Sequence, residues 1–306
     1  MATKPGNGGH GMENYDPNTG RYVGDGKTTS ISNELKSVLN LSDQDIINED
    51  LKNKYNLSNE DIEQNKLIDK KNAEMKKERK EAREERVYDE EIEKAGDELY
   101  DYFQSIEKPI TEDVVSLCES LGGMMYGLDQ RVKSKHSIKS KLNRYLKNNG
   151  IPVENTKRDF HDGLRYTVIF DSENFVNSVQ KLFSELEKKG YQRTYFVNRF
   201  FDSEGNLNPK YRDVITNFKT PDGKEFEIQL NTVKGICAKN GKEYTEDGEF
   251  IDRKDGESGS HAYYKERQEL PPNDDSSRAR YLDYMMEKTW KGIPVPNGIE
   301  NIGGKS

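Results

Sequence analysis

The sequence predicts an α/β (α+β) domain, a mixed β-sheet flanked by helices, behind a charged helical N-terminal extension. Beyond about residue 99, apolar residues recur at helical spacing in some segments and at strand spacing in others, and the two kinds of segment alternate. Before that point the chain is mostly polar, with 21 charged residues among the 30 at positions 69–98. We expect four parts: a flexible tail at 1–30, a charged helical spacer at 31–98, the folded domain at 99–292 and a C-terminal tail at 293–306.

Composition narrows the class of protein. Only 31% of the 306 residues are hydrophobic and 34% are charged, which favours one ordinary core plus much solvated sequence. A net charge of −8 argues against a protein that coats nucleic acid. Cys118 and Cys237 lie far apart and form neither a disulfide framework nor a metal-ligand spacing, so we expect a reducing, cytoplasmic setting. No apolar run of about eighteen residues and no secretory signal is present, so no membrane partner is expected.

The N-terminal segment 6–26 is rich in glycine, asparagine and aspartate, which are turn-forming residues. One interpretation is a flexible tail. The other is a docking peptide, because the stretch from Tyr15 to Val23 resembles the openings of some phage virion-associated proteins, which would bind capsid or portal components. Both interpretations remain open.

The extension is expected to be helical. Leu41-Ser-Asp and Leu57-Ser-Asn each place a serine before acidic residues, which is typical of a helix N-cap and predicts two short paired helices. Mixed-sign charges three and four residues apart at 69–98 predict a solvated helix with local ion pairs.

Within the domain, the first elements expected are helices. Val114, Leu117 and Leu121 share one helical face, and glycines at 122–123 end that helix. Residues 137–149 predict a basic amphipathic helix that stops at Gly150.

Strands and a further helix follow. Residues 164–170 predict a strand, and Ser172 is expected to cap a helix whose apolar stripe begins at Phe175. A second strand is expected at 191–200. Segments 211–219 and 224–232 flank the turn Pro221-Asp222-Gly223 and predict a hairpin.

A dense basic segment opens the amphipathic helix. Five cations lie within eleven residues of a chain that is acidic overall: Arg131, Lys133, Lys135, Lys139 and Lys141. Such repulsion is relieved by an anion, and basic groups at a helix start can hold phosphate oxygens. An exposed basic helix without a ligand is the alternative.

Acidic residues could complete a nucleotide site. Asp162 stands at the entrance of the first strand, while Glu227 and Gln229 continue one polar face of the hairpin strand that begins with Glu225. Carboxylates on adjacent strands can hold the Mg²⁺ that bridges nucleotide phosphates. A polar strand face that merely meets solvent is the alternative.

Taken in order, these motifs resemble the synthetase domain of RelA/SpoT-type alarmone synthetases, particularly the small and toxic members and their relatives in phage and polymorphic toxins. The resemblance covers roughly residues 110–290. It rests on five motifs: Arg131-x-Lys133-x-x-x-Ser137-Ile-x-x-Lys141, Asp162-x-Leu-Arg165, Tyr211-Arg212, Phe226-Glu227-Ile-Gln229-x-x-Thr232 and His261-x-x-Tyr264-Lys265.

The resemblance implies a nucleotidyltransferase-like fold and a pyrophosphokinase, a transferase that moves pyrophosphate from ATP to a ribose 3′-hydroxyl. It implies that Arg131, Lys133, Ser137, Lys141, His261 and Lys265 bind ATP phosphates. It also implies that Glu227, Gln229 and Arg165 are catalytic. Asp162 and Glu227 would hold Mg²⁺, with Asp159 as the substitute for Asp162, and Tyr211 would stack on the acceptor base.

Three positions depart from the family's pattern and bear on the acceptor. Lys210 stands where glycine is usual, Ile215 where histidine is usual and Asn231 where arginine is usual. The acceptor is left open between a guanine or adenine nucleotide and the 3′ end of tRNA. Two hypotheses follow: a growth-inhibiting effector of toxin type that acts in a host cytoplasm, and a virion-associated cargo or structural protein, packaged in a phage particle, whose synthetase fold is inactive.

Overall fold

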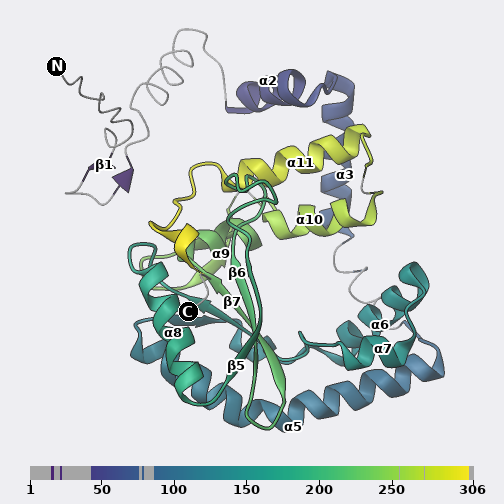
Figure 1. Cartoon of the computed structure of the whole chain (residues 1–306). Helices are drawn as coiled ribbons and strands as arrows, with labels where there is room; N and C mark the ends of the chain where they lie inside the picture. Colours follow the sequence, from purple (N-terminus) through teal and green to yellow (C-terminus); the bar gives the residue numbers. More distant parts are fainter. Residues whose placement is uncertain are drawn as a thin grey trace, which may run out of the picture. The chain divides into compact units, whose positions relative to one another are not determined.

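The computed structural model describes residues 15–16, 21–22, 43–75, 78, 86–254, 256–271 and 273–302 (Figure 1). The chain divides into two compact units, Met1–Ile62 and Glu63–Ser306. In the first unit, β1 (Tyr15–Asp16) pairs antiparallel with β2 (Arg21–Tyr22). Most of the segment expected to be a flexible tail or a docking peptide lies outside the described residues, so both interpretations stay predictions.

Two helices form where the serine-acidic pattern predicts them: α2 (Asp43–Tyr55) and α3 (Asn59–Glu74). At the start of α3, the Ser58 hydroxyl accepts a hydrogen bond from the Asp61 backbone N–H at 3.1 Å, and the Ser58 N–H donates to the Asp61 carboxylate at 3.0 Å. This reciprocal pair confirms the predicted cap.

The prediction of a single helix at 69–98 is wrong. Helix α3 ends at Glu74, residues 86–89 are not helical, and α5 (Glu90–Ser120) begins at Glu90. The second part of the segment is also not a solvated spacer, because Ile92 and Ala95 of α5 are buried in the domain core. The folded domain therefore begins earlier than residue 99.

A five-stranded mixed sheet organises the second unit, in the order β3-β4-β7-β6-β5. Its strands are β3 (Met124–Tyr126), β4 (Arg165–Ile169), β5 (Gln192–Asn198), β6 (Val214–Lys219) and β7 (Glu225–Asn231). The central pair β4 and β7 is parallel and the other neighbours are antiparallel. The predicted strands and the predicted hairpin of β6 and β7 are confirmed, and so is the predicted fold class.

One face of the sheet is apolar and is covered by helices. Tyr166, Phe218, Phe226 and Ile228 belong to one buried cluster together with the apolar stripes of α5 and α8 (Phe175–Lys188). Burial of this continuous apolar face supplies the main driving force for folding.

Helix α6 (Lys135–Asn149) and helix α7 (Val153–Arg158) pack beside α5, as Figure 1 shows. Ile138 and Leu142 bury the predicted apolar side of α6, and Gly150 ends it in the left-handed conformation, as expected. The cap expected at Ser172 is wrong: α8 is preceded by Asn174, whose side chain makes no capping bond.

A second helical group is formed by α9 (Val233–Asn240), α10 (Ser260–Glu269) and α11 (Ser277–Trp290), which pack on one another (Figure 1). Trp290 of α11 is 1% exposed, and its indole N–H donates to the Ser260 hydroxyl at 3.0 Å. A small ribbon of β8 (Lys242–Tyr244) and β9 (Phe250–Asp252) follows α9.

The end of the chain differs from the expected tail at 293–306. The segment contains the 3₁₀ turn Ile299–Asn301, and both Ile299, which begins the turn, and Ile302, which follows it, belong to the domain core, at 2% and 4% exposed. The Ile299 carbonyl also accepts a hydrogen bond from the side-chain Nδ2 of Asn198 at 2.8 Å. This segment therefore packs onto the domain at least as far as Ile302.

None of the helices in the described ranges is long and apolar enough to cross a bilayer.

Replacing Ile299 with alanine should lower the free energy of unfolding by about 2–4 kcal/mol, because the change leaves a cavity in the core. Urea denaturation measures the loss. Val87, which is 88% exposed, provides the control, and Val87→Ala should change stability by less than about 0.5 kcal/mol. Equal stability of both variants would contradict the packed C-terminal segment.

Candidate functional site

The polar face of the sheet brings together the three residues expected to be catalytic. Arg165 of β4 is paired in register with Glu227 of β7, whose backbone N–H donates to the Leu164 carbonyl at 2.9 Å. Gln229 lies two residues along the same face, and its amide donates to Glu227 Oε1 at 2.7 Å. Residues paired in neighbouring strands share a face, so a cation, a carboxylate and an amide meet here.

A short backbone pairing carries the basic segment to the start of β4. The Lys133 N–H donates to the Gly163 carbonyl, and the Arg165 N–H donates to the Arg131 carbonyl, both at 2.8 Å. Gly163 is required for close packing, since a Cβ there would lie 1.9 Å from the Phe103 ring. This pairing places Lys133 beside Asp162.

Asp162 is held by two lysines from different elements. Lys133 donates to one carboxylate oxygen, and Lys141 of α6 donates to the other at 2.7 Å. Burial disfavours the charged carboxylate, but the two ammonium groups outweigh it and lower the pKa of Asp162 to about 2. The pKa of Lys133 is lowered by its own burial despite Asp162. The arrangement is an anion site whose anion is a side chain of the protein.

The other cations of the basic segment are also paired within the chain. Arg131 forms two bonds to Glu107 of α5, at 2.7 and 2.9 Å. Lys139 contacts Glu93 at 2.5 Å and Asp97 at 3.0 Å, and Lys135 lies 3.2 Å from Asp97. Anions do relieve the repulsion, as expected, but here they are carboxylates of α5. Binding of ATP phosphates by these cations stays a prediction.

Ser137 occupies the third position of α6. Its backbone N–H donates to the capping hydroxyl of Ser134 at 3.3 Å, and the two hydroxyls are 3.0 Å apart. Its predicted phosphate contact stays a prediction.

Tyr211, expected to stack on an acceptor base, is 7% exposed. Its ring lies 5.4 Å from the Tyr264 ring and 6.3 Å from both His261 and Trp290. The guanidinium of Arg199 lies 4.7 Å from the ring centroid and the ammonium of Lys239 lies 5.3 Å from it, a cation–π arrangement. Stacking of Tyr211 on a base stays a prediction, but in this conformation its ring is already packed.

His261 of α10 belongs to the same cluster, and Lys265 lies one turn further on. Burial, together with Lys265, Lys239 and other nearby cations, lowers the pKa of His261 to about 4. The buried Nδ1 has no hydrogen-bond partner among the described residues. At neutral pH His261 is uncharged, so as a phosphate ligand it would donate a hydrogen bond and supply no charge.

A buried network that includes residues missed in the sequence links this cluster to the sheet. Asp213, 0% exposed, accepts two bonds from Arg199, at 2.7 and 2.9 Å, and one from Lys239 at 3.1 Å. Lys239 also donates to the side-chain oxygen Oε1 of Gln229 at 2.9 Å, which turns the Gln229 side-chain NH₂ group toward Glu227. Burial opposes the charge of Lys239, but Asp213 raises its pKa.

A signal for this network existed in the sequence. Asp213 stands at the start of an apolar strand, and Lys239 ends an apolar run, Ile236-Cys-Ala, in a short helix. Charged residues in such positions are rarely buried unless they are paired.

Asp162 and Glu227 have donor chemistry that suits Mg²⁺, which commonly takes one or two protein carboxylates and completes its shell with water and substrate phosphates. The low pKa keeps Asp162 ionised, as a metal ligand must be. Within the described ranges no group of three or more histidine, cysteine or acidic side chains is placed to hold a metal. Asp159, the substitute ligand, is largely exposed and pairs with Arg158 at 3.2 Å.

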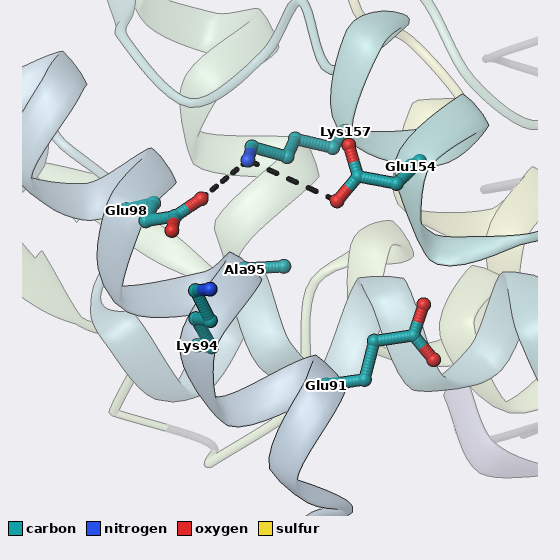
Figure 2. A pocket seen from close by; sticks show the side chains of 6 residues that line it. All are labelled: Glu91, Lys94, Ala95, Glu98, Glu154 and Lys157. Atoms are coloured by element: carbon teal, nitrogen blue, oxygen red, sulfur yellow. Dashed lines mark hydrogen bonds and ion pairs between the residues drawn. The ribbon is translucent and has the colours of Figure 1, made fainter.

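Two surface pockets are lined by residues other than the predicted site residues. The first, about 300 Å³, lies between α5 and α7 and is lined mostly by charged side chains (Figure 2). Figure 2 shows Lys157 between Glu98 and Glu154, so this pocket contains its own ion pairs. The second, about 480 Å³, is lined in part by Tyr102, Phe160 and Glu225. Neither pocket is lined by a residue predicted to bind ATP, metal or acceptor.

Three solved structures are similar to part of this chain, at 20% sequence identity or less. They are the Type VI effector Tas1 in complex with its immunity protein (20% identity over 65% of this chain and 95% of that chain, TM-score 0.43), a GTP pyrophosphokinase family protein from Streptococcus pneumoniae (13%, 67% and 90%, 0.38) and the small alarmone synthetase 1 from Bacillus subtilis bound to its product pppGpp (12%, 63% and 88%, 0.34). The sequence matches no protein-family model and no curated protein.

Asp213→Asn should destabilise the protein by about 3–5 kcal/mol, because it leaves the buried Lys239 and the partly buried Arg199 without a compensating charge. Urea denaturation tests this. The exposed pair Lys188–Glu185 provides the control, since Glu185→Gln should cost less than about 1 kcal/mol. A loss as small as that of the control would show that Asp213 is not the anion that holds this cluster.

Stability should fall as the pH drops from about 6.5 toward about 4, in part through His261. Its folded-state pKa is about 4 against an ordinary value of 6.5, so in this range the unfolded chain binds the proton and the folded chain does not. His261→Phe should therefore flatten the pH dependence of the unfolding free energy in this interval. Parallel curves for the two proteins would contradict the buried, neutral imidazole.

Proposed function

We propose that this protein is an ATP-dependent pyrophosphokinase that transfers pyrophosphate from ATP to the ribose 3′-hydroxyl of a nucleotide or of a tRNA end. One observation carries the proposal. Lys133 and Lys141 converge on a single carboxylate at the start of β4, the strand that places Arg165 beside Glu227. The two lysines, which can bind phosphate, thus adjoin Glu227, which can act on the acceptor hydroxyl.

The lysine pair is suited to phosphate. Both ammonium groups are largely buried and already hold an anion, the Asp162 carboxylate. A triphosphate carries more charge than one carboxylate and competes for the same donors. When the lysines turn to the phosphates, Asp162 is released to act as a ligand for Mg²⁺.

The other residues assigned to phosphate differ in whether a carboxylate of the chain already binds them. Arg131 must be released by Glu107 before it can bind a phosphate, so we assign the donor phosphates first to Lys133 and Lys141. The side chain of Arg165 makes no hydrogen bond or ion pair with a described residue, so its guanidinium is available to a phosphate beside Glu227.

In the transfer, the 3′-oxygen of the acceptor forms a bond to the β-phosphorus of ATP, the bond from that phosphorus to the α–β bridging oxygen breaks, and AMP leaves. When bound at Asp162 and Glu227, Mg²⁺ neutralises charge on the phosphates. Glu227 accepts the proton of the hydroxyl, while Gln229 fixes the orientation of that carboxylate through its bond to Oε1. No described residue hydrogen-bonds to Glu227 Oε2.

Glu227→Gln should reduce the transfer by about a hundredfold or more, because an amide can neither accept the proton nor neutralise the metal. The measurement is incubation with Mg²⁺ and ATP labelled on its γ-phosphate, with GDP, GTP, ADP, ATP or bulk tRNA as acceptor, followed by chromatography. Glu225→Gln is the matched control: Glu225 lies on the same strand face, pairs with His161 at 2.5 Å and should be dispensable.

Full activity of Glu227→Gln would overturn the assignment of Glu227. Absence of label on every acceptor with the unaltered protein would overturn the enzyme and point to the virion-cargo hypothesis. Growth arrest on expression, abolished by the same substitution, would support an effector of toxin type.

A further inference from the structure

We propose that the acceptor base stacks on Tyr195, with Asn217 beside it as a polar contact to the same nucleoside. This inference rests on the proposed function and adds an acceptor-binding surface that the motifs do not contain. It follows from the register of the sheet.

A row of four side chains crosses the sheet through Glu227. Arg165 of β4 is paired with Glu227 of β7, Glu227 with Asn217 of β6, and Asn217 with Tyr195 of β5. Directly paired residues point to the same side of a sheet, so all four project from one face.

The neighbouring residues confirm which face this is. Phe196 and Phe218, adjacent in sequence to Tyr195 and Asn217, pack against Phe183 of α8 on the covered side, with ring centroids 6.3 and 5.8 Å away. Because successive strand residues alternate, Tyr195 and Asn217 project from the opposite, polar side.

The spacing of the row suits one nucleoside. Neighbouring strands lie about 4.8 Å apart, so Tyr195 stands about 10 Å across the sheet from Glu227 with Asn217 between them. With the 3′-hydroxyl at Glu227, the sugar lies over β6 and the base reaches β5. The phosphates of ATP then approach from the side of β4, where Arg165 and the lysine pair lie.

Tyr195 is open to a ligand in a way that Tyr211 is not. Its side chain is 52% exposed and forms no hydrogen bond or ring contact with any described residue, whereas Tyr211 is 7% exposed. Aromatic faces bind bases by stacking whatever the base, because every base has a π-face. In the conformation described, the free ring on this side of the sheet is therefore that of Tyr195.

Asn217 adds a second observation. It is 9% exposed, and its side-chain oxygen is buried without a hydrogen-bond partner among the described residues. Buried polar atoms nearly always have a partner, and an exception calls for a cause. A hydroxyl of the acceptor sugar over β6 supplies the missing donor once the Asn217 amide turns toward it.

The test uses the full chain and three variants: Tyr195→Ala, Tyr195→Phe and, as the control, Tyr102→Ala. Tyr102 is a comparably exposed tyrosine, 42%, on α5. The measurements are the KM for each of ADP and GDP as acceptor, the KM for ATP, kcat, and equilibrium binding of ADP and GDP. Circular dichroism checks that each variant is folded, as expected for substitutions at half-exposed positions.

For Tyr195→Ala we expect the KM and the dissociation constant of the acceptor to rise about tenfold to a hundredfold, because one base–aromatic stack is lost. The KM for ATP should stay unchanged. Tyr195→Phe should restore both values, because it keeps the ring and loses only the hydroxyl. Tyr102→Ala should behave as the unaltered protein.

Unchanged acceptor affinity in Tyr195→Ala, or a rise in the KM for ATP instead, would overturn the inference. Equilibrium binding separates this from the proposed function. Suppose that the unaltered protein transfers no pyrophosphate but binds ADP or GDP, and that of the three variants only Tyr195→Ala loses this binding. The stacking surface is then confirmed, and the proposed pyrophosphokinase activity is wrong. If the unaltered protein binds neither nucleotide, the stacking surface is wrong.

Discussion

The parallel pairing of β4 with β7 is the constraint on which the site depends. These strands are distant in sequence, with α8, β5 and β6 between them along the chain. Once paired, they set Arg165 beside Glu227 and align both with Asn217 and Tyr195. The apolar residues that alternate with these polar ones are buried against α5 and α8, so a slip of one residue would turn every polar side chain of the row into the core.

Charge compensation within the chain is the second organising feature. The positive charges of the basic segment at 131–141 are neutralised without a ligand, by acidic side chains of α5 and by Asp162. Any phosphate ligand of this segment would have to compete with these carboxylates, and its binding energy would be the difference between two sets of charge-assisted bonds. Lys133 and Lys141 are the cations whose exchange from carboxylate to phosphate would also release a ligand for a metal.

The buried network of Asp213 connects the helices α9–α11 to the sheet. One carboxylate holds Arg199 and Lys239, these cations flank the ring of Tyr211, and Lys239 fixes Gln229 against Glu227. The positions of Gln229 and Glu227 thus depend on a cluster on another element. The same cluster buries Tyr211, and the exposed tyrosine of the sheet, Tyr195, remains as the surface on which a base can stack.

Local pattern in the sequence determined the strands β4 to β7, the turn at 221–223, the basic amphipathic helix ended by Gly150 and the polar face that carries Glu227 and Gln229. These features depend on period, turn chemistry and capping, which act over a few residues. Tertiary structure alone decided the carboxylate partners of each cation, the burial of Tyr211 and Ile299, the network of Asp213 and the row that joins Tyr195 to Glu227. Each of these depends on contacts between segments far apart in the chain, which pairing register and core packing select. Local pattern indicated at most that Asp213 and Lys239 would be paired, and it did not identify their partners.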